Sequence, residues 1–249
     1  MLSLTDPKSN NPVLASLQIK TSEKIISVKE NGSADSNFIL THLIKQIFYE
    51  KNKILLIGLH NTLDHYQNVG KKLGYDFKKS IDDHQAGIIE PLDDLTQKII
   101  EDDVYENKEE LVKCLFGEIQ SQIALLSEST TQQIYLIVDD LSHLLDLGVD
   151  IAHIISFINY CNSLVDTENV AVVINTHVCN KIDEIISNTL QYVSDVHIEV
   201  ASLKTGRSTD VTGVINVSRD GGTNHYQYKT FDRGVKTFHP GQAIFNMYK

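Results

Sequence analysis

Two consecutive carboxylates, Asp139 and Asp140, directly follow the most apolar segment of the chain, residues 134–138. A carboxylate at the carboxyl end of a buried strand is typical of a Walker B motif, where it holds the magnesium ion of a bound nucleotide. Any buried strand that leaves the core also tends to reach polar residues, so the pattern alone is weak. The pair predicts either a remnant of a nucleotide site or an ordinary strand end.

A phosphate-binding loop would have to lie between the first expected strand, residues 24–29, and the helix expected to begin near Asp35 or Ser36. Such a loop needs glycines for close backbone approach, a Lys for the β and γ phosphates and a hydroxyl for magnesium. Residues 32–38 hold one glycine and no Lys, and Asp35 puts a carboxylate where phosphate would bind. We therefore interpret Gly32, Asp35 and Ser36 as a degenerate phosphate loop, and we expect no cofactor and no catalytic residue.

The apolar pattern along the chain indicates an α/β protein with a mainly parallel central sheet. Continuous apolar runs predict buried strands, and apolar residues at three- and four-residue spacing predict helices between them. Strands are expected at residues 24–29, 53–59, 134–138 and 169–174. Residues 62–73 and 108–126 are expected to be helical. Parallel strands joined in this way need helices on both faces of the sheet, and the alternation from Asp195 onward predicts C-terminal antiparallel hairpins.

The charge is unevenly distributed along the 249 residues. Lys and Arg number 22 and Asp and Glu number 33, so the net charge is -11, which argues against broad nonspecific binding of nucleic acid. From Lys204 to the end, seven basic residues stand against three acidic ones, so this tail carries +4 and the remainder -15. One end of the protein could face phosphate; alternatively, a β-rich segment simply carries solvated basic side chains.

Residues 82–110 contain eleven carboxylates against only Lys98 and Lys108. Such a density cannot be buried, so it predicts a solvated loop or helix face, and its spacing matches no calcium-binding loop. We expect an N-terminal extension over residues 1–20 and one domain over residues 21–249, with an acidic insertion around residues 82–110.

The cysteines and the apolar runs predict a protein without a metal or a membrane span. Cys114, Cys161 and Cys179 are far apart and form no C-x-x-C pair, which fits reduced thiols. His177 and Cys179 lie two positions apart without further ligands at metal-site spacing. No apolar run approaches the roughly 20 residues that cross a bilayer. We therefore expect a location in the cytoplasm, with the nucleus as a second location.

Several segments spread over most of the chain resemble one family. They are residues 65–74, 136–148, 157–161, 203–206 with 210–213, and 226–229. In their order and spacing these segments resemble the sixth subunits of the Elongator complex. The resemblance implies a RecA-like P-loop NTPase fold that has lost its Walker A loop.

The same resemblance implies partners and a function. The chain would assemble with the fourth and fifth Elongator subunits, two copies of each, into a six-membered ring. The ring would join the larger Elongator core, bind tRNA and support the modification of the wobble uridine, U34. This subunit would then be a non-catalytic scaffold. Two alternatives stay open: a RecA-like regulatory or recombination paralogue, and a ring ATPase acting on nucleotide at a subunit interface.

Loops at the carboxyl ends of the central strands generally meet nucleic acid in RecA-like rings. Lys181 is therefore the main candidate contact with tRNA, although an exposed Lys that begins a helix is common. Arg207 and Arg219 join it if the basic tail faces the same side. Lys204 and Arg207 follow a strand and could form a basic finger toward a neighbour's nucleotide, or an ordinary exposed turn.

The polar residues after the strand expected at 169–174 are Asn175, Thr176 and His177. RecA-like proteins keep a polar sensor residue at such a strand end. Without a nucleotide beneath it, this group is expected to cap the next helix or to line an interface.

Overall fold

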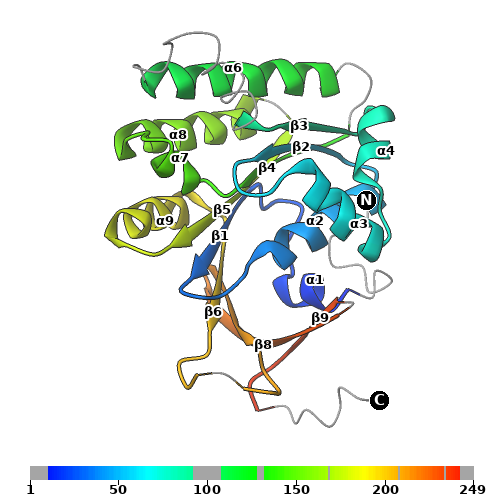
Figure 1. Ribbon diagram of the computed structural model, residues 1–249, viewed down its shortest axis with the longest axis vertical. Coiled ribbons are helices and arrows are strands. Elements are labelled where there is room, and N and C mark those ends of the chain that lie inside the picture. Colours follow the sequence, from blue (N-terminus) through cyan, green and yellow to red (C-terminus); the bar gives the residue numbers. More distant parts are fainter. Residues whose placement is uncertain are drawn as a thin grey trace.

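One sheet of nine strands runs through the part of the chain that the computed structural model describes (Figure 1). The described residues are 11–91, 108–127, 132–167, 169–206, 208–232 and 234–241. The strands lie in the order β3-β2-β4-β5-β1-β6-β7-β8-β9. Their bounds are β1 (Ile25–Asn31), β2 (Lys53–Gly58), β3 (Ala86–Ile89), β4 (Ile134–Asp139), β5 (Val170–Val178), β6 (Val196–Ser202), β7 (Gly213–Arg219), β8 (Gly222–Phe231) and β9 (Gly234–Phe238).

Strands β1 to β6 run parallel, and β7 to β9 extend the sheet as antiparallel hairpins. Strand β1 lies between β5 and β6, with Val28 opposite Asn175 on one side and Ile198 on the other. All six residues of β2 and of β4 are buried. A strand covered on both faces needs apolar residues at successive positions, which explains these continuous apolar runs. The expected parallel sheet with C-terminal hairpins is confirmed.

Eight helices in the described residues cover the two faces of the sheet (Figure 1). Helices α1 to α4 lie on one face, and α6, α8 and α9 lie on the other. Their bounds are α1 (Pro12–Leu17), α2 (Asn37–Tyr49), α3 (Leu63–Leu73), α4 (Phe77–Asp82), α6 (Lys108–Ser127), α7 (His143–Asp146), α8 (Ile151–Thr167) and α9 (Lys181–Val193).

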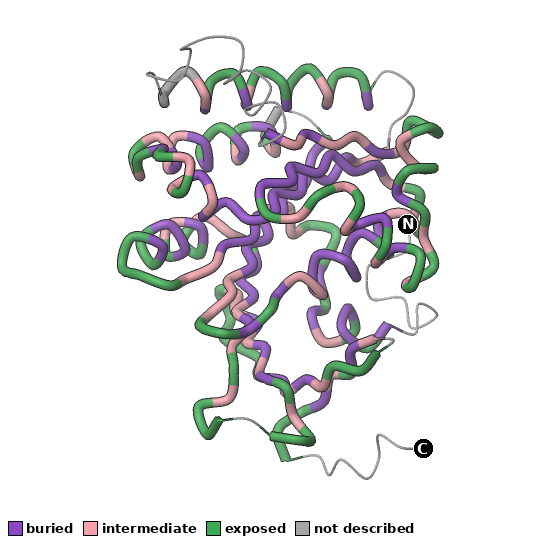
Figure 2. Tube along the Cα trace, viewed as in Figure 1, coloured by how far each residue is buried: buried purple, intermediate pink, exposed green. Residues whose placement is uncertain are grey.

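Each face of the sheet has its own hydrophobic core. Along β4, Tyr135 and Ile137 pack on the α2 side, whereas Leu136 and Val138 pack on the α6 and α8 side, because successive side chains of a strand point to opposite faces. The buried trace in Figure 2 is concentrated in these central strands and in the inner sides of the helices. Between the two cores, the carboxyl ends of the parallel strands lie at the same edge of the sheet.

Helix α1 corrects the expected boundary at residue 21. Its residues Val13, Leu14 and Leu17 are at most 2% exposed and belong to the same core as α2. The Ser16 hydroxyl lies 2.5 Å from that of Thr237 in β9, so the two ends of the described chain pack together. The part of residues 1–20 that is described is therefore a piece of the domain, and residues 1–10 lie outside the described residues.

Strand β3 was not expected, because it lies inside the segment that was predicted to be an acidic insertion. It pairs in parallel with β2, with Ile54 opposite Ala86, and forms one edge of the sheet. Only four residues make this strand, and two of them are buried. Four residues flanked by carboxylates are too few to show a regular alternation of apolar and polar side chains, so the sequence did not indicate a strand. Residues 92–107 of the acidic segment lie outside the described residues.

Strand β5 continues four residues beyond its expected end at residue 174. Asn175, Thr176 and His177 are strand residues that pair with β1, so they do not cap the next helix. Asn180 performs that role, since its side chain accepts hydrogen bonds at the start of α9 while Asp183 completes the capping box. Among the described helices, none is long and apolar enough to cross a membrane.

Candidate functional site

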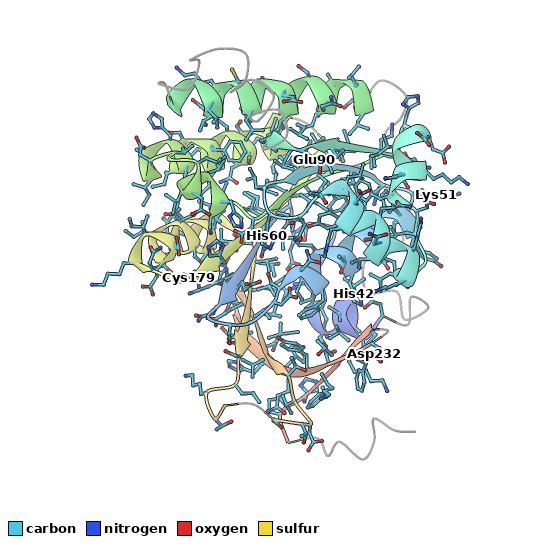
Figure 3. All side chains as sticks on the ribbon, viewed as in Figure 1. His42, Lys51, His60, Glu90, Cys179 and Asp232 are labelled. Atoms are coloured by element: carbon cyan, nitrogen blue, oxygen red, sulfur yellow. The ribbon has the colours of Figure 1, made fainter. Side chains whose placement is uncertain are left out.

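A cavity of about 290 Å³ lies where the carboxyl ends of β1, β4 and β5 meet the loop after β2. In open α/β sheets, ligands bind in the crevice outside the carboxyl ends of the strands. His60, labelled in Figure 3, is one of the lining residues and lies near the middle of the molecule. The lining consists of four carboxylates, four imidazoles and three amides: Glu30, Asp35, Asp139, Asp140, His60, His65, His143, His177, Asn37, Asn61 and Asn175. None of these residues is Lys or Arg.

Glu30, at the end of β1, places a carboxylate at the start of α2. Its Oε2 accepts hydrogen bonds from the Ser36 backbone N–H at 2.7 Å and from the Ser36 hydroxyl at 3.0 Å. Burial raises the pKa of Glu30, while the bonds from Ser36 act in the opposite direction. The N-terminus of a helix attracts anions through its free N–H groups. Here the chain itself supplies the anion that a phosphate loop would receive from a nucleotide.

Asp139 is the last residue of β4 and is 1% exposed. Its Oδ2 accepts hydrogen bonds from the Tyr66 hydroxyl at 2.5 Å and from the Asn61 amide at 3.0 Å. Its Oδ1 has no hydrogen-bond partner among the described residues. Burial raises the pKa of Asp139 against these two bonds. The carboxylate that stands in the Walker B position is therefore held inside the protein by side chains of the same chain.

Asp140 is bound to His177, which comes from the neighbouring strand β5. Asp140 Oδ2 lies 2.6 Å from His177 Nδ1, and Asp140 Oδ1 accepts the backbone N–H groups of Ser142 and His177. The bond to Asp140 raises the pKa of the His177 imidazole. The pair ties the end of β4 to the end of β5.

Two further imidazoles stack at the mouth of the cavity. The rings of His60 and His143 are parallel within 5°, with centroids 4.8 Å apart, and His60 Nδ1 lies 2.8 Å from His143 Nε2. The other nitrogen of His143, Nδ1, lies 2.8 Å from Asp146 Oδ2. The His143 and His177 ring centroids are 5.2 Å apart. Imidazoles from the loop after β2, the start of α7 and the end of β5 therefore lie next to one another.

The residues present do not fit a nucleotide with its magnesium ion. Triphosphate binding requires positive groups and free N–H groups, but Glu30 already occupies the Ser36 N–H and Asp35 adds a second negative charge at the start of α2. Tyr66 and Asn61 already bond one oxygen of Asp139. The predicted degeneracy of Gly32, Asp35 and Ser36 thus has a structural counterpart in Glu30, and no step of nucleotide chemistry follows from this geometry.

The basic candidates are divided between the two ends of the sheet. Lys181 is the first residue of α9 and is exposed, and Lys204 is exposed in the turn that follows β6. Because β5 and β6 both run parallel to β1, these two lysines lie at the same carboxyl edge as the cavity. Arg207 lies outside the described residues.

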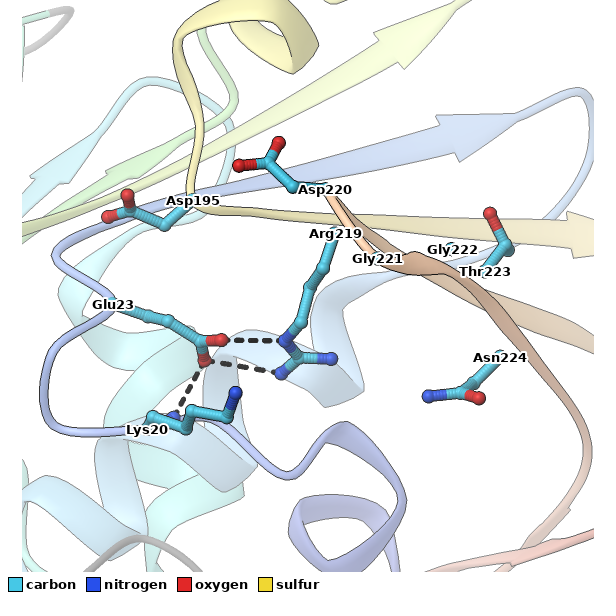
Figure 4. A pocket seen from close by; sticks show the side chains of 9 residues that line it. All are labelled: Lys20, Glu23, Asp195, Arg219, Asp220, Gly221, Gly222, Thr223 and Asn224. Carbon is cyan, nitrogen blue, oxygen red and sulfur yellow. Dashed lines mark hydrogen bonds and ion pairs between the residues drawn. The ribbon is translucent and has the colours of Figure 1, made fainter.

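Arg219 lies at the opposite, amino edge of the parallel strands. Strand β7 returns antiparallel to β6, so its last residue lies beside the beginning of β6. The Arg219 Nε lies 2.6 Å from Glu23 Oε1, and its Nη2 also donates to Glu23 Oε2 (Figure 4). The same Nη2 donates to the carbonyls of Leu17 and Gln18. The condition for Arg219 to join Lys181, that both face the same side, is therefore not met.

The fold and the cavity define a class of protein. A parallel sheet with helices on both faces, C-terminal hairpins and a carboxylate pair at the Walker B position is a RecA-like fold, here without a phosphate loop. A KaiC-like protein from Pyrococcus horikoshii has this fold, with a TM-score of 0.58 and 11% identity over 87% of this chain and 90% of that one. Another P. horikoshii protein, uncharacterised and solved with an unknown peptide, gives a TM-score of 0.65 and 10% identity over 97% and 100%.

Comparison with known sequences identifies the family of this chain. The family model described as Elongation complex protein 6 matches residues 9–235, so the chain belongs to the Elongation complex protein 6 family. Proteins named Elongator complex protein 6 are 25% identical in Danio rerio, over 84% of this chain and 88% of the relative. The Homo sapiens relative is 26% identical over 86% and 89%, and that of Drosophila melanogaster 26% over 87% and 90%. The resemblance to the sixth Elongator subunits is confirmed.

Sequence reasoning did not find Glu30, Tyr66, His60 or His143 as parts of the site. Glu30 lies at the end of β1, and His60 follows the end of β2 by two residues. A polar residue at the end of an expected strand is therefore the sequence signal that could have identified both. Tyr66 carried no signal, because a tyrosine in a helix usually marks the core.

Proposed function

We propose that this chain is a non-catalytic RecA-like subunit of the Elongator complex, which contributes surface to an assembly and does not use ATP itself. The carboxylate of Glu30 on the Ser36 N–H carries the proposal, because it fills the position that phosphate takes in an active relative. Family membership supports the complex, and the acidic lining of the cavity supports the loss of nucleotide binding.

Equilibrium titration of the isolated chain with a fluorescent ATP analogue and magnesium tests the loss of activity. We expect no saturable binding in the micromolar range and no phosphate release. An active P-loop ATPase titrated in the same buffer provides the positive control. Micromolar binding that unlabelled ATP displaces would overturn this part of the proposal.

We infer that the partners are the fourth and fifth Elongator subunits, two copies of each in a six-membered ring, which joins the larger Elongator core. The outer face of α9 supports an assembly surface, since Ile182 and Ile185 are each 50% exposed and Tyr192 is 91% exposed. Large apolar side chains on one exposed helix face are typical of a protein interface.

Co-expression of the three subunits followed by native mass spectrometry tests the ring. We expect a complex with two copies of each subunit, and we expect Ile185→Glu to reduce its yield at least tenfold. Leu125→Glu is the matched control, because Leu125 is 61% exposed on α6 instead of α9. Equal loss with both variants, or no loss with Ile185→Glu, would remove α9 from the interface.

The assembled ring would bind tRNA and support modification of the wobble uridine in the cytoplasm, with the nucleus as a second location. Cells that lack this chain should lose the modified U34 nucleosides, and the wild-type gene should restore them, as measured by mass spectrometry of digested tRNA. A fluorescent fusion that complements this defect would report the location. Unchanged U34 nucleosides would count against the function.

A ring ATPase that acts on nucleotide at a subunit interface is the second candidate. The exposed position of Lys204 at the carboxyl edge of the sheet favours it, since a basic side chain there can reach a neighbour's nucleotide. Lys204→Ala in the assembled ring would then lower ATP hydrolysis by at least tenfold without releasing subunits. Unchanged ATP hydrolysis in this variant would exclude a role of Lys204 in hydrolysis, and the scaffold function would remain the single proposal.

A further inference from the structure

Four side chains at the carboxyl edge of the sheet bring metal-binding atoms together. Asp140, His143 and His177 each offer one ligand atom, and these atoms all lie within 4.8 Å of one another. The Nδ1 of His60 lies 2.8 Å from His143 Nε2, so His60 is a fourth donor beside this group, outside the set of atoms that lie within 4.8 Å of one another. Zinc bonds to nitrogen and oxygen are about 2.0–2.2 Å long, so tetrahedral ligand atoms lie roughly 3.4 Å apart. The ligand atoms of Asp140, His143 and His177 are close to that spacing, and His60 would complete the set by turning toward them from its place beside His143.

His143 already has the carboxylate partner that a histidine ligand has in metal sites. Histidine ligands usually give their other ring N–H to a carboxylate, which fixes the ring and strengthens the bond to the metal. His143 has this arrangement, since its Nδ1 lies 2.8 Å from Asp146 Oδ2 while its Nε2 faces His60. Asp146 lies at the surface, with 71% of its side chain exposed, so its contact with His143 contributes little to folding stability and its role is to orient the imidazole.

The cavity beside the cluster favours a cation. Its lining has four carboxylates and no Lys or Arg, and the buried Oδ1 of Asp139 has no hydrogen-bond partner among the described residues. The cluster is also accessible: His60 is exposed, and the side chains of His143 and His177 are each 26% exposed. Imidazole donors select zinc and similar transition metals over magnesium or calcium, which prefer oxygen ligands.

A second group, His177, Cys179 and Asp183, also has ligand atoms within 4.8 Å of one another. It is the weaker candidate, because Asp183 Oδ2 already accepts the backbone N–H groups of Cys179 and Asn180 as part of the α9 capping box. Withdrawing Asp183 for a metal would leave those two N–H groups without their acceptor.

We propose that His60, His143, His177 and Asp140 bind one divalent transition-metal ion, zinc by its ligand chemistry, at the edge of the former nucleotide site. The ion joins the loop after β2, the segment after β4 and the end of β5, which come from three distant parts of the sequence. The function of this ion is structural, because four protein ligands fill the tetrahedral coordination of zinc and leave no position open for a substrate. It is independent of whether the chain binds a nucleotide.

Titration of the full chain with zinc chloride by calorimetry, after treatment with a chelator, tests the proposal. We expect one zinc per chain and no saturable binding of magnesium chloride. His143→Ala and His60→Ala should each weaken zinc binding by at least tenfold. Asp146→Asn should weaken it by about 10- to 100-fold, although Asp146 itself contacts no metal. Circular dichroism of each variant checks that the fold is retained.

His153→Ala is the matched control. His153 on α8 pairs with Asp150, which directly precedes that helix, as His143 pairs with Asp146, but His153 lies outside the cluster. This variant should bind zinc like the wild type. The cobalt-substituted protein should show d–d absorption without a thiolate charge-transfer band, and Cys179→Ser should leave both measurements unchanged.

Three results would overturn the proposal: no stoichiometric zinc binding, unchanged affinity in His143→Ala with the fold intact, or loss of binding in Cys179→Ser while His60→Ala still binds. The last result would move the ion to the group of His177, Cys179 and Asp183.

Discussion

Replacing Glu30 tests whether its carboxylate stabilises the start of α2 in place of a phosphate. In Glu30→Ala the buried Ser36 N–H loses its acceptor, whereas the Ser36 hydroxyl keeps Asn175 Oδ1 at 2.9 Å. One unsatisfied buried N–H costs about 1–3 kcal/mol. For a chain of this size, each kcal/mol corresponds to roughly 2–4 °C in melting temperature.

The matched variant is Glu30→Gln, which keeps an acceptor oxygen and removes the charge. Burial already disfavours the ionised form of Glu30, as its raised pKa shows, so this variant should lose less than about 1 kcal/mol. Urea unfolding of the purified chains, followed by circular dichroism, measures both free energies of unfolding. Neither variant should gain ATP binding, because the loop still lacks a Lys.

Two results would refute this reasoning. If Glu30→Ala lies within about 0.5 kcal/mol of the wild type, the bond to Ser36 contributes no stability. If Glu30→Gln is as unstable as Glu30→Ala, the charge and not the acceptor matters, and the carboxylate would act through longer-range electrostatics.

Three further predictions concern other parts of the chain. Burial lowers the pKa of His197 to about 4, so protonation of this imidazole favours the unfolded state. The free energy of unfolding should be constant above about pH 6.5 and fall by roughly 3 kcal/mol toward pH 4. His197→Asn should flatten this pH dependence, as measured by urea unfolding at several pH values. Lys181→Glu in the assembled ring should weaken tRNA binding for all sequences and reduce the salt slope by about 1 without releasing subunits, and an unchanged slope in filter binding would exclude Lys181. Arg219→Ala removes the ion pair and leaves Glu23 with the Lys20 backbone N–H as its remaining partner, which should cost about 2–4 kcal/mol in the isolated chain. Wild-type tRNA affinity in rings that still assemble would confirm that Arg219 is structural.

The central elements of the fold were predictable because their signals are local. Residues 53–58 and 134–139 are fully buried strands with continuous apolar runs between Lys53 and Gly58 and before Asp139, and strands of this kind need helices on both faces of the sheet. The loss of the phosphate loop was equally local, since a missing Lys and an added Asp35 can be read from seven consecutive residues. The four-residue strand β3 and the short helix α1 were missed, because neither is long enough to show a period.

By itself the sequence determined the central strands and the helices between them, the family, and the absence of a Lys between the first expected strand and the first expected helix. These properties depend on residue types within short windows. Only the tertiary structure decided that Glu30 bonds Ser36, that His60, His143 and His177 meet, and that Arg219 points away from Lys181. Parallel strands bring loops from distant positions to one edge of the sheet, and a single antiparallel return carries a residue to the other edge. Which side chains meet there depends on the order of the strands within the sheet, and no local pattern encodes that order.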